Sequence, residues 1–316
     1  IDLTGKKEFD KPADIPSKVI QATENAPVSI PDPILKVGET VVHMHLSGYR
    51  KELAQEANLY LNTLMNGQQP YTAAINPETG EATFKFWQYG SAQALISVGM
   101  GTGHIWLAPG EETDVYMDMR RSGQMILKRR TEKKQLPPFE MTPACYATGT
   151  YAGLLSPSLY SDKYYSMNLY SGDFADYKMT ASEYTQHVIN LYQALSDSIA
   201  HSSLPTAGKE MAMLNLKQEA VKAMAQGDFF REHNYRKVNN QWDRSQRMDI
   251  KIDPLTAENR IKLCKLFPIA DPKLLIGRDV MSYVSAIANP TVAWPKEANL
   301  EGTFAADLKL VLPLIQ

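Results

Sequence analysis

Residues 39–49, ETVVHMHLSGY, decide the fold expected of the first half of this chain. An apolar side chain recurs at every second position from Val42 to Leu46, and His43 and His45 occupy the positions between. Side chains of a β-strand point alternately to its two faces, so a period of two predicts a strand with one buried face. The two histidines are expected on the polar face.

The same short period continues to about residue 120, broken by turn sequences such as NPETGE and APGEE. No helical period separates these runs, which is typical of two packed antiparallel sheets. Residues 34–130 are therefore predicted to form an antiparallel β-sandwich of the immunoglobulin-like type. The further expected strands lie in NLYLNTLMNG (58–67), SAQALISVG (91–99), HIWLAP (104–109) and TDVYMDM (113–119).

The pattern changes to helices in the second half, so the fold class expected is α+β. Residues 1–33 contain Pro31 and Pro33 and are predicted to be an extended arm, residues 131–143 a connector, and residues 144–316 an α-helical domain. Thr180 and Glu183 have the spacing of a capping box that opens a helix through Ile199. Further helices are expected at about 205–227, 256–267, 273–288 and from 303 onward.

Composition argues against several classes of function. The chain has 33 Lys plus Arg against 35 Asp plus Glu, so its net charge gives no reason to expect nucleic-acid binding. No apolar run approaches the ~20 residues of a membrane span, and no segment resembles a secretory signal. Cys145 and Cys264 are too far apart for a C-x-x-C motif, and both are interpreted as inert thiols.

Sequence motifs for enzymes and cofactors are missing. GMGTG (99–103) leads into a predicted strand, whereas a phosphate-binding loop needs the start of a helix. The chain contains no G-x-x-x-x-G-K-[ST], no G-x-S-x-G and no H-E-x-x-H. We assign no catalytic residue and expect no cofactor, and enzymatic activity of the chain stays undecided from its sequence.

His43 and His45 are the only candidate metal ligands. Two histidines at i and i+2 on one face of a strand can chelate zinc or copper when a third ligand comes from elsewhere. The sequence identifies no such third ligand. Solvated strand histidines are the alternative interpretation.

Tyrosines are concentrated in the run from Tyr151 to Tyr177. A tyrosine ring has an apolar face and a polar tip, which suits sugar stacking, a protein interface or packing between domains. Both a binding surface and internal packing are consistent with the run. The candidate surface residues are Tyr160, Tyr164, Tyr165, Tyr170 and Tyr177. The four tryptophans, Trp87, Trp106, Trp242 and Trp294, are expected in the cores.

Four segments resemble one protein family: IDLTGKK (1–7), LKVGETVVHMHLSGYR (35–50), WLAPGEETDVYMDM (106–119) and ACYATGTYAGLLS (144–156). They are similar to the non-catalytic middle region of exported TlpA-like thiol-disulfide oxidoreductases, in the thioredoxin-like superfamily, of Gram-negative anaerobes. The resemblance implies a preceding N-terminal β domain, a following thioredoxin-like domain with W-C-x-x-C, and an extracytoplasmic location, in the periplasm or at the outer membrane. IDLTGKK is then expected to be the segment in which the chain leaves that preceding domain. The last helix is expected to be incomplete at the end of the sequence.

The chain lacks the catalytic motif of this family, because it contains no W-C-x-x-C. The resemblance therefore implies a scaffold or partner-recognition region. Its partners would be its own flanking domains and, with them, protein thiol or disulfide substrates. The alternative is a glycan- or peptide-binding module that uses the tyrosine-rich surface.

Overall fold

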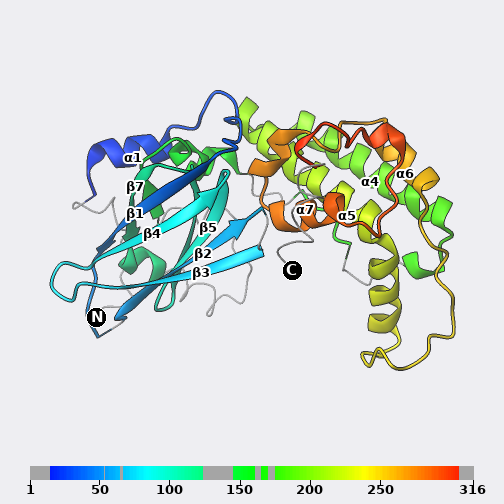
Figure 1. Cartoon of the computed structure of the whole chain (residues 1–316), viewed down its shortest axis with the longest axis horizontal. Coiled ribbons are helices and arrows are strands. Elements are labelled where there is room, and N and C mark those ends of the chain that lie inside the picture. The colour runs from blue at the N-terminus through cyan, green and yellow to red at the C-terminus, as the bar shows by residue number, and fades with distance from the viewer. Residues whose placement is uncertain are drawn as a thin grey trace. The chain divides into compact units, whose positions relative to one another are not determined.

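The computed structural model describes residues 15–52, 54–64, 67–123, 145–160, 165–169 and 175–305. The fold is α+β, with two antiparallel-rich sheets and several helices, as the sequence predicts (Figure 1). The chain divides into two compact units. Of the described residues, the first unit contains those up to 160, apart from 64 and 67, together with 204–208, and the second contains the rest.

Within the described residues the strands belong to the first unit, apart from Gly67 at the start of β3. The first sheet has the order β4-β1-β7-β8 and the second has the order β3-β2-β5-β6. The strands are β1 (Val37–Ser47), β2 (Glu56–Thr63), β3 (Gly67–Ala74), β4 (Glu81–Tyr89), β5 (Ala92–Val98), β6 (Gly101–Leu107), β7 (Glu112–Asp118) and β8 (Cys145–Ala147).

Strand β1 lies inside the first sheet and contains the stretch that predicted it. It pairs antiparallel with β4 and parallel with β7, because the chain passes through the second sheet before it returns as β7. Val42 and Met44 are fully buried and Leu46 is nearly so. The predicted alternation is therefore confirmed, and His43 and His45 point to the opposite, outer face.

A short helix, α1 (Ser17–Glu24), covers one end of this outer face. Ile15, Val19 and Ile20 pack around Tyr146 of β8, and the Thr23 hydroxyl bonds to the backbone of β8. The prediction that residues 1–33 form an extended arm is thus wrong for residues 17–24, which form α1. The apolar side chains of α1 are buried by their contact with this sheet.

Residues 144–316 are not wholly helical, because β8 belongs to the first sheet. Two 3₁₀ turns follow β8, η2 (Ala152–Leu155) and η3 (Pro157–Leu159), and they also lie in the first unit. The predicted connector, 131–143, lies outside the described residues.

Helices make up the second unit. Within the described ranges no helix combines the length and the hydropathy that a membrane-spanning segment needs. The elements are η4 (Asp176–Lys178), α4 (Ala181–Ala200), α5 (Thr206–Val238), α6 (Ala257–Cys264), η5 (Pro272–Ile276), α7 (Val280–Ala288) and η6 (Lys296–Ala298).

The start of α4 confirms the predicted capping box: Thr180 and Glu183 satisfy each other's backbone N–H groups. The first helical segment of α5 ends where the sequence predicts, since the helical dihedrals break at Gln226, next to Gly227. A second helical segment, which was not predicted, continues to Val238. Gly227 also serves packing. A Cβ atom there would lie 2.5 Å from the ring of Tyr184, which no real contact allows.

A single helix over 273–288 is also wrong. The Gln218 side chain lies where the chain divides into η5 and α7, donating to Leu274 O at 2.6 Å and accepting from Asp279 N at 2.9 Å. A Cβ atom at Gly277 would lie 2.4 Å from this amide, so only glycine fits. The buried amide replaces backbone hydrogen bonds that a continuous helix would make.

A buried polar network holds η4 to α5 within the second unit. Asn234 Nδ2 donates to Asp176 Oδ2 at 2.8 Å, and both side chains are buried. Arg231 is fully buried, donates to Met179 O and lies with its guanidinium 5.0 Å from the ring centre of Tyr184. Burial raises the pKa of Asp176, although hydrogen bonds and the Arg231 charge oppose the rise.

This shift predicts a pH dependence of stability. Because the folded state holds the Asp176 proton more tightly than the unfolded state, its contribution is complete at low pH and is lost as pH rises through the folded pKa. Asp176→Asn should flatten that part of the curve in urea unfolding measured from pH 2 to pH 8, a range that includes the acid region in which Asp243 titrates. Asp243→Asn is the control of opposite sign, since hydrogen bonds from Ser245 lower the pKa of Asp243. Equal slopes for wild type and Asp176→Asn would contradict the assignment.

Candidate functional site

The outer face of the first sheet brings both predicted histidines together with acidic side chains. Register places His43 opposite Thr83 of β4 and Asp114 of β7, and His45 opposite Glu81 of β4. Three neighbouring strands therefore contribute to one polar surface. Helix α1 covers only the β8 end, so the two imidazole rings remain about one-third exposed, at 33% and 27%.

His45 lies between two carboxylates. Its Nδ1 is 3.3 Å from Glu81 Oε1 and its Nε2 is 3.2 Å from Asp114 Oδ1. An ionised carboxylate can only accept, so both contacts are hydrogen bonds only when both ring nitrogens carry hydrogen. Tyr116 stacks on the same ring, with centroids 4.4 Å apart. His45 therefore has a carboxylate on each side of its ring.

His43 has different partners. Its Nε2 is 2.6 Å from Glu112 Oε1, and its Nδ1 is 3.4 Å from Thr83 Oγ1. His43 thus has one carboxylate partner, and its other partner is a hydroxyl, which can donate or accept. The two histidines therefore differ in their hydrogen-bonding partners, although they are two residues apart on one strand.

The metal site considered for His43 and His45 stays a prediction. Each ring is used by its own carboxylate partners. Among the described residues, no group of three or more His, Cys, Asp and Glu side chains has the geometry to hold a metal ion. The surface is better described as a network of ion pairs that ties β4, β1 and β7 together.

The tyrosine candidates are not shown to form one surface. Tyr164 and Tyr170 lie outside the described residues. Tyr160 belongs to the first unit and donates to Leu154 O at 2.7 Å, whereas Tyr165 and Tyr177 belong to the second. The ring of Tyr177 packs edge-on against that of Tyr235 at 5.6 Å. Tyr160 and Tyr177 are thus engaged in packing inside their own units.

Exposed aromatic side chains occur instead on β4. Trp87 is 59% exposed and Tyr89 is 51% exposed. They lie two residues apart on the outer face of an edge strand, beside the ion pair between Lys85 and Glu39 at 3.1 Å. The expectation that all tryptophans belong to the cores is wrong for Trp87 and for Trp242. The alternation of EATFKFWQY, with Phe84 and Phe86 inward, contains the signal that places Trp87 outward.

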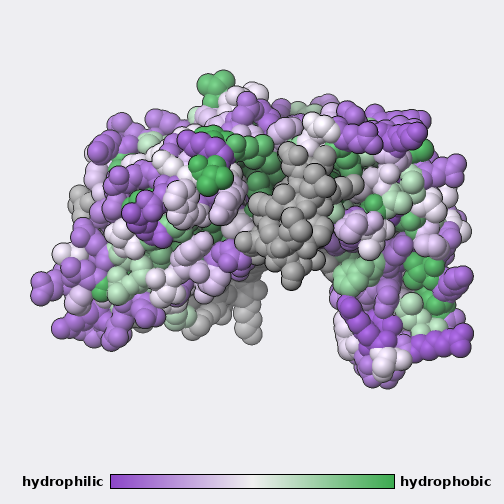
Figure 2. All heavy atoms as spheres, viewed as in Figure 1, coloured by the Kyte–Doolittle hydropathy of each residue, from purple (hydrophilic) through white to green (hydrophobic). Residues whose placement is uncertain are grey.

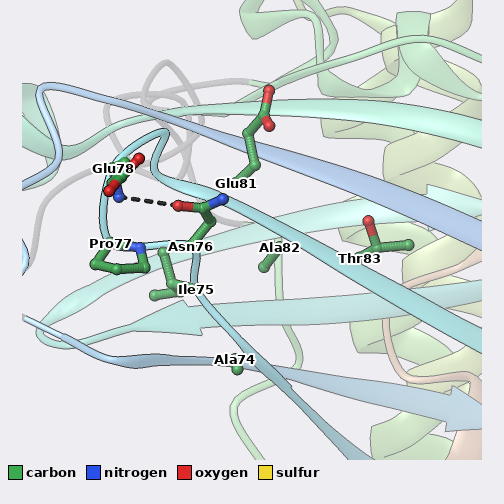
Figure 3. Close-up of a pocket in the computed structure, with 8 residues that line it drawn as sticks. All are labelled: Ala74, Ile75, Asn76, Pro77, Glu78, Glu81, Ala82 and Thr83. Atoms are coloured by element: carbon green, nitrogen blue, oxygen red, sulfur yellow. Dashed lines mark hydrogen bonds between the residues drawn. The ribbon is translucent and has the colours of Figure 1, made fainter.

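An open hollow of about 690 Å³ adjoins the histidine surface at the hairpin between β3 and β4. It is lined by residues 74–78 and 81–83, and so shares Glu81 and Thr83 with the network above (Figure 3). Asn76 Oδ1 accepts from the backbone N–H of Glu78 at 2.9 Å and shapes the turn. The lining includes two exposed carboxylates and no cation, and its polar groups serve the turn and the network.

Neither thiol has the surroundings of a nucleophile. Cys145 is buried in β8, and burial raises its pKa to about 12. Cys264 ends α6 in the other unit, and burial together with the Glu297 charge raises its pKa to about 11. A reactive cysteine needs a lowered pKa, because the thiolate attacks. The sequence-based interpretation of both thiols as inert agrees with these shifts.

Replacing His45 tests the ion-pair network. His45→Phe keeps a ring to stack on Tyr116 but removes both carboxylate contacts, so the free energy of unfolding should fall by about 1 kcal/mol, as for a partly exposed network. Urea unfolding at low and at high salt measures it, and the loss should shrink at high salt. His43→Phe is the matched control, with a smaller salt-dependent loss. A larger salt-dependent loss for His43→Phe would contradict the assignment to His45.

Comparisons with known proteins give no assignment for the chain. No family model, no curated protein and no solved structure matches it.

Proposed function

We propose that this chain is the non-catalytic recognition region of an exported TlpA-like thiol-disulfide oxidoreductase. In this proposal the strand-rich unit is an immunoglobulin-like sandwich and the location is extracytoplasmic. The partners are the chain's own flanking domains, an N-terminal β domain and a C-terminal thioredoxin-like domain, and the protein thiol or disulfide substrates of the latter.

The raised pKa values of the two cysteines and their location in separate units are the observations on which the proposal depends. Thiol exchange needs a thiolate that attacks a disulfide and a second thiol that resolves the mixed disulfide. Cys145 and Cys264 lie in separate units and have raised pKa values, so neither role is supported. Exposed aromatic side chains in each unit, Trp87 and Trp242, support recognition instead, since tryptophan is enriched at interfaces.

The first test measures reductase activity. The purified chain should not accelerate the reduction of insulin by dithiothreitol, because it supplies no low-pKa thiol pair. A Cys145→Ser, Cys264→Ser double variant should give the same rate as the wild type. Acceleration by the wild type that the double variant loses would contradict the proposal.

The alternative function, glycan or peptide binding, is favoured by one observation, the exposed Trp87 and Tyr89 on β4. Alternate residues of a strand are about 7 Å apart, so the two rings can contact adjacent parts of one extended ligand. Lys85 and Glu39 beside them supply hydrogen-bonding groups. This surface replaces the tyrosine-rich run as the candidate platform.

A glycan array tests this alternative. If Trp87 stacks on a sugar, Trp87→Ala should weaken binding of any captured oligosaccharide about tenfold or more. Trp242→Ala is the matched control, because Trp242 is equally exposed in the other unit. Equal losses from both substitutions, or no captured oligosaccharide, would count against a glycan platform on β4.

A further inference from the structure

The C-terminal part of α5 forms, with the loop that follows it, an exposed aromatic and cationic tip. After the break at Gln226 this part of the helix extends beyond the neighbouring helices of its unit, and the chain turns back along it (Figure 1). Hydrophobic and hydrophilic side chains are mixed over its surface (Figure 2). We call residues 229–251 the α5 tip.

Aromatic and cationic groups form a continuous row on the tip. The Arg244 guanidinium lies 5.3 Å from the ring centre of Phe229, Phe229 lies 6.3 Å from His233, and His233 lies 5.7 Å from Trp242. Phe229 is 40% exposed and Trp242 is 57% exposed. Tryptophan and arginine are the side chains that most often dominate binding at protein interfaces.

The row is held in place by buried groups. Arg236, which is buried, donates to the backbone oxygens of Asp243 and Gln246 at 3.1 and 3.3 Å. The hydroxyl of buried Tyr235 accepts from Asp249 N at 3.1 Å. The loop that carries Trp242 and Arg244 is therefore fixed before any partner arrives, which lowers the entropic cost of binding.

The charge of the tip differs from that of the whole chain. Within the tip, the part after the buried Arg236, residues 237–251, contains four cations, Lys237, Arg244, Arg247 and Lys251, and two acids, Asp243 and Asp249. The chain as a whole has a net charge of −2. All four cations are exposed. A partner that complements this surface is acidic, since charge complementarity steers association and fixes register.

We infer that the α5 tip binds an acidic polypeptide segment that contains aromatic residues. Carboxylates of the segment pair with Arg244 and Arg247, and its aromatic rings pack on Trp242 and Phe229. A guanidinium that stacks on a ring still offers its edge to a carboxylate. A peptide fits better than a lipid surface, because the row alternates rings with the Arg244 cation, which stacks on one side of Phe229, and does not form a continuous apolar face that could insert. This inference rests on the proposed recognition function and names the surface and partner class.

Binding of the full chain to a fluorescently labelled random copolymer of glutamate and tyrosine tests the inference by anisotropy. The wild type should bind this copolymer and not polylysine. Arg244→Glu with Arg247→Glu, and separately Trp242→Ala, should each weaken binding about tenfold or more. Lys296→Glu and Met100→Ala are matched controls, a charge reversal in the same unit and an equally exposed apolar side chain in the other, and should bind as the wild type does. Unchanged melting temperatures exclude misfolding as the cause.

Three outcomes would overturn the inference: no binding of the copolymer, equal binding of polylysine, or equal losses in the control variants. Stronger binding to phosphatidylserine vesicles than to the copolymer would also overturn it, in favour of a lipid surface. These outcomes are separable from failure of the proposed function, because insulin reduction reports on the cysteines alone. If copolymer binding is lost only in the tip variants and the chain has no reductase activity, the result supports both the proposed function and the inference about the α5 tip.

Discussion

Strand β1 is hydrogen-bonded along both edges, to β4 and to β7, and every side-chain position on the first sheet depends on that double pairing. A slip of one residue would exchange the two faces of the strand. Val42 and Met44 would then meet water, and His43 and His45 would enter the core without partners. The buried apolar face therefore fixes the register, and the register places each histidine beside its own acidic neighbours.

The sequence predicted what depends on local pattern and missed what depends on distant contacts. The alternation in β1 and the capping box at Thr180 are local, and both were predicted correctly. The break at Gly277 could not be predicted, because it is made by Gln218, about sixty residues earlier in the chain. Helix α1 likewise needs Tyr146 of β8 to cover its apolar side chains.

The candidate site was predicted in part for the same reason. Alternation placed His43 and His45 on the polar face, but their acidic partners come from β4 and β7 and required the register. Trp87 was assigned to a core because its residue type outweighed its position, although the same alternation in β4 places it outside. The tyrosine run was interpreted as one feature, whereas its described members are divided between two units.

The two exposed tryptophans differ in the ligand chemistry they suit. Trp87 lies beside Lys85 and Glu39, which neutralise each other, so that surface favours an uncharged ligand with many hydroxyls. Trp242 lies in a row with Arg244, within a segment of excess positive charge held by the buried Arg236, so that surface favours an acidic ligand. Because each tryptophan belongs to a different unit and has different charged neighbours, the two proposed surfaces would select different ligands.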